Sequence, residues 1–267
     1  MYGFLLKKSF CDGWDNLLSL VVTNVIILFA TMGLLTLAAY AAKLSNNIVF
    51  ALLFVAACII ISILVFAYGE LAADIANFNG VSLVEYFKQI PKVLKDGTLF
   101  GLFISAAAIV SLLAFDYYFL QMQSLVGVFL GGLILWCDIF LILALQWFLP
   151  IRSLMHNGFR KCLKKSFIVF FDNTGFSLLV ALYSLVCLIL TVLTVGFVPG
   201  ASGILINTTN ALRIRLYKYD YLEEHPELQG KRDRKKIPWE ELIYEDRETL
   251  GPRKLKSFLF PWKEENK

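Results

Sequence analysis

The charged and amide side chains inside long apolar runs are the residues of this chain that could do chemistry. Asp138 lies near the middle of one such run, LWCDIFLILALQW, where a carboxylate costs about 2.5 to 3.5 kcal/mol to insert into a bilayer. It could be a proton or cation site, or a substrate contact. It could instead be protonated and hydrogen-bonded, holding helices together with Asn24, Thr31 or Ser62 as its partner. The sequence leaves both interpretations open.

Two further pairs of polar residues are candidates. Glu70 and Asp74 are four residues apart, so they share one helix face; they could form a coupling or cation site or be solvated carboxylates. Asn207 and Asn210 follow a stretch rich in Pro and Gly, residues 196–203. A broken helix of this kind can line a transport site, and Pro and Gly are also the residues that a tight connection needs.

Small residues recur at four-residue spacing. Gly127 and Gly131 form one G-x-x-x-G pair, and Gly97, Gly101 and Ser105 form a second ridge. Such ridges allow close approach of helix backbones. We expect packing within the chain rather than a dimer face.

Enzyme, metal and cofactor chemistry are not indicated. The chain has two histidines and five cysteines without C-x-x-C spacing, and it contains neither a phosphate-binding loop nor a nucleophile-elbow or zinc-protease motif. The net charge of +4 does not follow a basic stripe on a soluble fold, which argues against nucleic acid as a partner. We expect a non-enzymatic protein without cofactor or metal.

The elements that must position these residues are membrane-spanning helices. The chain is 58% hydrophobic and 17% charged, against about 25% charged in soluble domains, and its mean hydropathy is +0.68. Apolar runs of the length that spans a bilayer predict five helices, and a shorter sixth segment, 199–216, carries amide and hydroxyl side chains. The five are Leu17–Ala42, Ile48–Tyr68, Thr98–Leu120, Leu125–Phe148 and Thr174–Val198.

Lysine and arginine alternate between the two sides of these segments. They occur before the first span, in the loops 70–97 and 152–173 and above all after Ala211, and are sparse in the other connections. By the positive-inside rule, this pattern puts both termini in the cytoplasm and requires the sixth crossing. We therefore predict an all-α, six-span helical bundle in the lipid bilayer of a bacterial cytoplasmic (inner) membrane.

The starts of spans one, three and five are similar to one another. Each has a basic amphipathic stretch followed by Asp12-Gly13, Asp96-Gly97 or Asp172-Asn173 and then a span. This predicts a surface helix, a turn at the Asp pair and a new helix. Three helical-hairpin repeats would follow, although any inward-starting span needs similar residues.

The chain divides at residue 218 by composition. Residues 1–218 are a transmembrane domain, and residues 219–267 a charged cytoplasmic tail that contains Lys231–Lys236. A short amphipathic helix is predicted from Pro238 to Gly251. Its apolar stripe comprises Trp239, Leu242, Ile243 and Leu250, and a later aromatic cluster comprises Phe258, Leu259, Phe260 and Trp262. Either could dock on lipid or on a partner protein.

The order of these features resembles the YesL-type family of small bacterial membrane proteins. The likeness rests on KKSF followed by WDNLLSLVVTNVIILF, on FRKCLKKSF before a later span and on FVPGASGILI, and it covers roughly residues 1 to 216. The resemblance implies an integral membrane protein without an assigned biochemical activity, associated with sugar-uptake ABC systems.

The second cytoplasmic loop looks similar to the EAA loop through which ABC permeases contact their ATPase. The likeness is carried by Glu70, Ala72, Ala73, Gly80, Phe87, Ile90 and Pro91. It implies contact with other transporter subunits. The sequence thus predicts an accessory or component of a solute transport system, with a carbohydrate as the solute that the resemblance implies. A self-contained secondary transporter using Asp138, and a structural or envelope-assembly role, are the alternatives; the oligomeric state stays open.

Overall fold

The computed structural model describes residues 1–43, 47–228 and 237–253, and within them no β-strand occurs. The helices, in chain order, are α1 (Tyr2–Asp15), α2 (Leu17–Lys43), α3 (Asn47–Ala76), α4 (Leu83–Phe115), the π-helix η1 (Asp116–Gln121), α5 (Leu125–Leu145), α6 (Phe148–Met155), α7 (Phe159–Asp172), α8 (Thr174–Leu193), α9 (Gly200–Glu224), the 3-10 helix η2 (Pro226–Leu228), α10 (Trp239–Leu242) and α11 (Tyr244–Leu250).

Five of these stretches are long and apolar enough to cross a membrane. They are Leu17–Lys43, Ile48–Ala76, Leu83–Gln121, Leu125–Met155 and Thr174–Leu193. Each overlaps one of the five predicted spans, although the third begins at Leu83 rather than at Thr98. The prediction of an all-α membrane protein is confirmed at this level. The segment 199–216 forms the greater part of α9, which is not among the five, so a sixth crossing stays a prediction.

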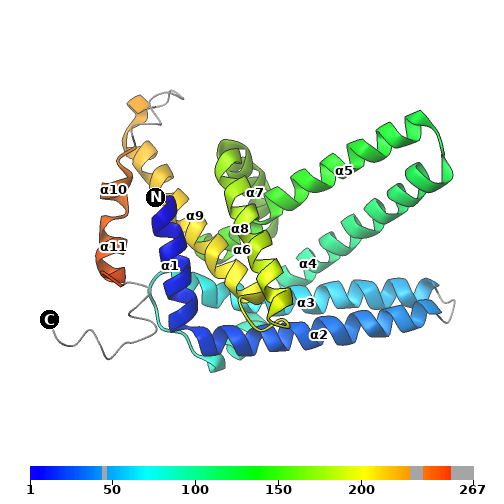
Figure 1. Cartoon of the computed structure of the whole chain (residues 1–267), viewed down its shortest axis with the longest axis horizontal. Helices are drawn as coiled ribbons and strands as arrows, with labels where there is room; N and C mark the ends of the chain where they lie inside the picture. Colours follow the sequence, from blue (N-terminus) through cyan, green and yellow to red (C-terminus); the bar gives the residue numbers. More distant parts are fainter. Residues whose placement is uncertain (44–46, 229–236, 254–267) are drawn as a thin grey trace.

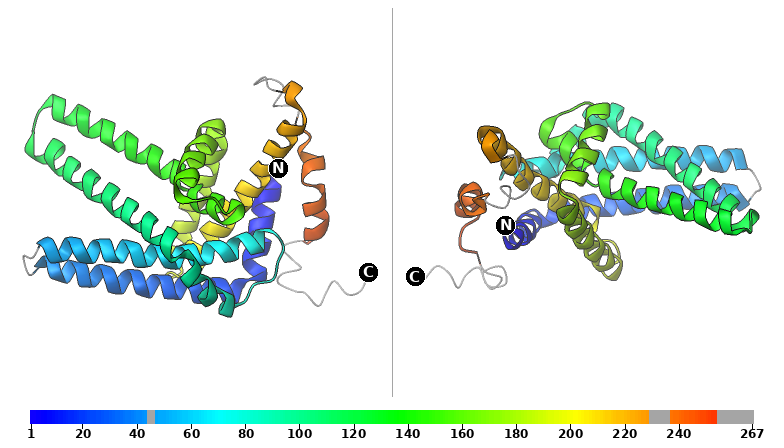
Figure 2. Two further views of the ribbon diagram at one scale, coloured as in Figure 1. Left: turned by 180° about the vertical axis from the view of Figure 1, so that it is seen from behind. Right: turned by 90° about the horizontal axis from the view of Figure 1, so that it is seen from above.

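The spans diverge from a common base (Figures 1 and 2). α2 and α3 form one long hairpin, and α4 and α5 form another that opens away from it. The outer ends of both hairpins are largely uncovered, as expected for surfaces that face lipid. The main buried cluster lies where α3, α4, α6, α7 and α9 meet, and its largest side chains are Trp147, Tyr68, Tyr86, Phe66 and Phe148.

α9 is the centre of the base. It contacts α1, α2, α3, α6 and α8, and it buries polar and charged side chains, including Asn207, Asn210, Arg215 and Lys218. An isolated membrane helix with this composition would leave these groups unsatisfied, so α9 depends on the helices around it.

The predicted turns are only partly present. The break expected at Asp172-Asn173 occurs at Asn173, between α7 and α8. At the first span, by contrast, Asp12-Gly13 lies within α1, and the break falls at Asn16. At the third span there is no break, because Asp96 and Gly97 lie inside the continuous helix α4. The prediction of three alike helix-turn-helix starts is therefore wrong for the middle one.

Close packing of α4 on α3 explains why α4 continues. A Cβ atom on Gly97 would lie 2.9 Å from the Ile63 Cα, and one on Gly101 would lie 2.5 Å from the Ile59 Cα. The glycine ridge thus seats α4 directly on the α3 backbone. Gly127 and Gly131 of α5 serve the other hairpin, where added Cβ atoms would meet the Tyr118 carbonyl oxygen and the Phe119 ring at 2.6 Å each.

The tail packs on the helical body. α9 runs through the predicted boundary at 218 and ends at Glu224. The predicted short helix forms as two pieces, α10 and α11, and it ends at Gly251, which has a φ of +70°. Ile243 and Leu250 of its apolar stripe are buried. The segment Lys231–Lys236 and the aromatic cluster at 258–262 lie outside the described residues.

Candidate functional site

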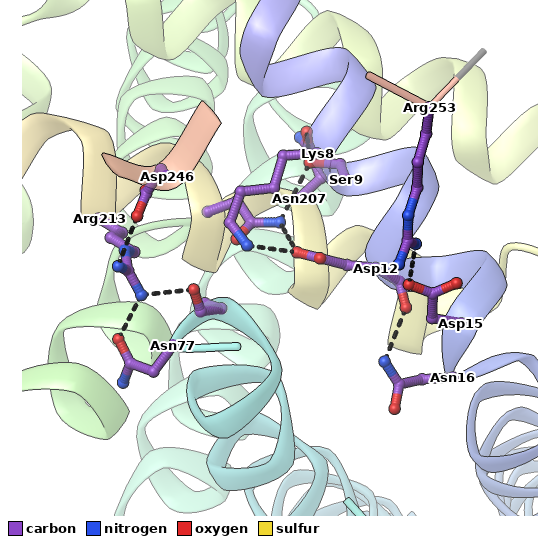
Figure 3. A network of polar contacts seen from close by, with 12 residues as sticks. Lys8, Ser9, Asp12, Asp15, Asn16, Asn77, Asn207, Arg213, Asp246 and Arg253 are labelled. Atoms are coloured by element: carbon purple, nitrogen blue, oxygen red, sulfur yellow. Dashed lines mark hydrogen bonds and ion pairs between the residues drawn. The ribbon is translucent and has the colours of Figure 1, made fainter. Parts of the chain in front are cut away.

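The base contains a set of buried polar side chains that bridges α1 and α9, here called the polar core: Lys8, Ser9, Asp12, Asn207 and Asn210 (Figure 3). The spacing of the residues on α1 and of those on α9 brings each group onto one helix face. The Lys8 ammonium donates to Asp12 Oδ2 at 3.0 Å, and the Asn210 amide donates to the same oxygen at 2.7 Å. Ser9 Oγ donates to Asn207 Oδ1 at 3.1 Å.

Burial sets the electrostatics of the polar core. Lys8 is 1% exposed, and its Nζ lies 3.5 Å from the centre of the Phe78 ring. Burial lowers the pKa of Lys8 and raises the pKa of Asp12, so desolvation weakens the charged forms of both partners. Their mutual contact and the Asn210 amide act in the opposite direction. The pair is consequently sensitive to the loss of either member.

A second polar cluster ties the tail to the base; we call it the tail clamp. Arg213 donates to Asp246 Oδ1 at 2.8 Å, to Asn77 Oδ1 at 2.6 Å and to the Ala76 carbonyl at 2.5 Å. The Tyr217 hydroxyl lies 3.2 Å from both oxygens of Asp246. One arginine of α9 therefore joins the end of α3 to α11, as Figure 3 shows in part.

A third cluster, here called the Arg152 cluster, joins α3, α4 and α6. Arg152 of α6 contacts Glu70 of α3 and donates to Asp96 of α4 at 3.0 Å. The Glu70 side chain is 14% exposed, so the interpretation of this residue as a solvated carboxylate is wrong. Asp74 is the residue predicted to share a helix face with Glu70. Its backbone carbonyl oxygen accepts the N–H groups of Asn77 and Asn79, which closes the end of α3.

Asn24 has a fixed structural position. Its amide nitrogen donates to the carbonyls of Phe197 and Pro199, at 2.9 and 2.8 Å, and its oxygen accepts from Ser202 N–H at 3.0 Å. A Cβ atom on Gly200, which has a φ of +62°, would lie 2.2 Å from this amide. Asn24 thus holds the start of α9 against α2, and the glycine permits the close approach.

Asp138 lies apart from all of these clusters. Ser111 of α4 donates to its Oδ1 at 2.8 Å, and both residues belong to the α4–α5 hairpin. A hydrogen bond to another helix is therefore present, but its partner is Ser111 and not Asn24, Thr31 or Ser62, which lie on α2 and α3. The structure therefore brings Asn207 and Asn210 together but leaves Asp138, Asn24 and Glu70 in three separate settings.

The α1 residues of the polar core, Lys8, Ser9 and Asp12, were not predicted from the sequence to be functional. Lys8 and Asp12 were visible as a basic residue and an acidic residue four apart, and Ser9 and Asp12 have the same three-residue spacing as Asn207 and Asn210. That spacing could have signalled two matching polar faces. Because a basic amphipathic helix is expected to lie at the membrane surface, these side chains were not expected to be buried.

Comparison with known proteins gives no match: no family model, curated protein or solved structure is similar to this chain. Within the described residues, no group of three or more His, Cys, Asp or Glu side chains could hold a metal ion. The fold and its apolar helices define a multi-pass α-helical membrane protein, and its polar clusters gather at one end.

Proposed function

We propose that this protein is a non-enzymatic accessory or component of a solute transport system in the bacterial cytoplasmic membrane, with both termini in the cytoplasm and α9 as the sixth crossing. The resemblance to the YesL-type family and the alternation of basic residues support this placement. In this orientation the tail clamp and the Arg152 cluster lie toward the cytoplasm, where partner subunits would bind.

The observation that carries the proposal is an exposed apolar face at the start of α4. Val84 is 60% exposed, Phe87 54% and Leu94 47%. Their spacing puts them on one side of the helix, and Lys88, Lys92 and Lys95 flank them. Phe87 belongs to the stretch that resembles an EAA loop, and the face fits an apolar partner surface with an acidic rim.

This face is held in a fixed position. Ser82 and Glu85 form a reciprocal capping box at the start of α4, with the Ser82 N–H donating to Glu85 at 2.8 Å. Tyr86, on the opposite side of the helix, is fully buried and donates to the Leu64 carbonyl. A preformed face lowers the entropic cost of binding, as expected for a docking element.

The geometry gives less support to a self-contained carrier. A coupling carboxylate should lie where several helices meet around a substrate path. Asp138 instead pairs with Ser111 within one outlying hairpin. This arrangement suits the alternative interpretation of Asp138, a hydrogen-bonded group that holds two helices together.

The test is purification from native membranes in a mild detergent, with mass spectrometry of the retained proteins. The double variant Val84→Ser/Phe87→Ser removes the exposed face. Val110→Ser/Phe129→Ser is its matched control, because these residues are similarly exposed, at 66% and 65%, but lie near the tip of the α4–α5 hairpin, away from the start of α4. An ATPase or permease subunit should accompany the wild type and the control and be lost with the α4 variant.

If no transporter subunit is retained by the wild type, the accessory function is wrong. The next experiment would then compare solute uptake by wild type and Asp138→Asn. Loss of uptake only in that variant would point to the carrier.

A further inference from the structure

A polar cavity of about 770 Å³ lies beside the polar core, between the start of α1, the α7–α8 corner, α9 and α10. Arg215 and Lys218 of α9 line it, together with Asp172, Tyr2 and Trp239. The cavity thus contains two cationic side chains and one carboxylate.

Arg215 is the unusual member of this cavity. It is 6% exposed, its guanidinium carbon lies 3.7 Å from the centre of the Phe176 ring and 5.3 Å from that of Trp239, and its Nε has no hydrogen-bond partner. The Tyr2 hydroxyl also interacts with it. A buried guanidinium with an unused donor is costly unless an acceptor is supplied.

The carboxylate of the cavity, Asp172, already has hydrogen-bond partners within the protein. Lys218 donates to Asp172 at 2.8 Å and to Asn173 at 2.9 Å, and the Tyr219 hydroxyl donates to Asp172 at 3.1 Å. Within the described residues, no ion pair involves Arg215. The charge that remains for a ligand is therefore positive, and a planar guanidinium suits a phosphate group.

An apolar cavity of about 470 Å³ adjoins this polar one. It lies between α1 and α8, with Leu6, Leu179 and Leu182 among its walls. Tyr2 lines both cavities, and its ring lies 5.8 Å from that of Phe176, on which Arg215 stacks. A cationic pocket thus lies next to an apolar groove along a membrane-spanning helix, with Tyr2 in the wall of both.

The apolar cavity contains a second unused donor. Asn207 lines it, is 1% exposed, and its amide nitrogen has no partner while its oxygen accepts from Ser9. Asn207 and Arg215 lie on the same side of α9, about 12 Å apart at 1.5 Å per residue. Along α9, Arg215 therefore provides a cation in the polar cavity, and Asn207 provides an amide donor beside the apolar groove.

We propose that this composite site binds one anionic phospholipid of the cytoplasmic leaflet, with its phosphate at Arg215 and Lys218 and an acyl chain between α1 and α8. The Asn207 amide donates to an ester carbonyl. Charge complementarity selects the anionic class, because the headgroup cation of a zwitterionic lipid would meet two cations of the protein. The proposal uses the membrane orientation given above but no transport partner.

The experiment uses the full-length protein, delipidated in detergent and titrated with phosphatidylglycerol or phosphatidylcholine, with bound lipid counted by native mass spectrometry. Arg215→Gln keeps side-chain bulk and removes the charge. Arg160→Gln, at an exposed position of α7, is the matched control. We expect one tightly bound phosphatidylglycerol, bound about tenfold more weakly by Arg215→Gln, as follows from losing one charged hydrogen bond, and unchanged in Arg160→Gln.

A second variant separates lipid from free phosphate. Leu182→Trp fills the groove and should weaken phosphatidylglycerol binding while leaving the charged pocket intact. Equal binding of the two lipids, unchanged binding by Arg215→Gln in a protein that unfolds at the wild-type temperature, or equal stabilisation by inorganic phosphate alone would each overturn the proposal. Absence of a co-purifying transporter subunit would not affect it, so the two proposals fail separately.

Discussion

The corner between α1 and α2 and the corner between α7 and α8 have similar sequences but different surroundings. Each has Lys-Lys-Ser-Phe followed at the same distance by Asp-Asn, in one case Asp15-Asn16 and in the other Asp172-Asn173. In both, the Asn amide donates to the carbonyl four residues earlier, at 2.9 and 3.3 Å. A short local bond therefore sets the bend in both places.

The partners of the two corners differ. The first buries Lys8 with Asp12, whereas the corresponding residues of the second are Lys165, which is partly exposed, and Val169, which is buried and apolar. Asp15 pairs with Arg253 of the tail, while Asp172 pairs with Lys218 of α9. The comparison shows that one sequence motif can specify a bend while its tertiary setting decides whether the helix carries a buried charge.

The largest expected effect comes from breaking the buried pair of the first corner. Asp12→Ala leaves the Lys8 ammonium uncompensated and should lower the free energy of unfolding by about 3–5 kcal/mol. The double variant Lys8→Met/Asp12→Leu should recover most of this loss, because two apolar side chains replace the pair. Thermal unfolding in detergent measures both. Val169→Ala is the control at the second corner, and a loss as large as that of Asp12→Ala would contradict the assigned difference.

The two corner asparagines should differ in importance. Asn16→Ala removes one local bond and should cost about 1 kcal/mol. Asn173→Ala also removes contacts with the Lys218 ammonium at 2.9 Å and the Tyr219 hydroxyl at 2.6 Å, so about 2–3 kcal/mol is expected. The same unfolding measurement ranks them. Equal losses would mean that the local bond alone matters.

The acidic residues of the corners provide a weaker contrast. Lys218, the partner of Asp172, has an 8% exposed side chain, whereas Asp15 and Arg253 are about half exposed, at 47% and 44%. Asp15→Asn should therefore cost less than about 1 kcal/mol and lose even this effect at high salt. Asp172→Asn should cost more and depend less on salt. The salt series of unfolding temperatures distinguishes the two pairs.

The smallest signal concerns the thiols beside the corners. Cys11 and Cys162 are both fully buried, and burial raises the pKa of both, that of Cys162 to about 11. Because the thiolate is the reactive form, neither should react with maleimide at pH 8. Raising the pH to 9 should change this little, since Cys162 stays protonated below its pKa. Rapid labelling of the folded protein, read by mass spectrometry, would show that a corner opens.

The sequence predicted the five apolar helices because twenty consecutive apolar residues leave few other structures in a bilayer. It did not predict the polar core, since a basic amphipathic helix such as α1 has the same pattern whether its charges face headgroups or a neighbouring helix. The Asp138 partner was mistaken for a similar reason. Hydropathy shows where the helix that carries Asp138 lies, but it does not show that the side with Asp138 faces Ser111 of α4.

α9 has a consequence for how the chain is made. Its polar face finds its partners on α1, which is synthesised before it, with α2 to α8 in between. Because α9 buries polar groups that pair with earlier helices, it can pack only after those helices have been made. α1 and α9 thus meet late during synthesis, and until they meet each presents an unpaired polar face that marks the chain as not yet folded.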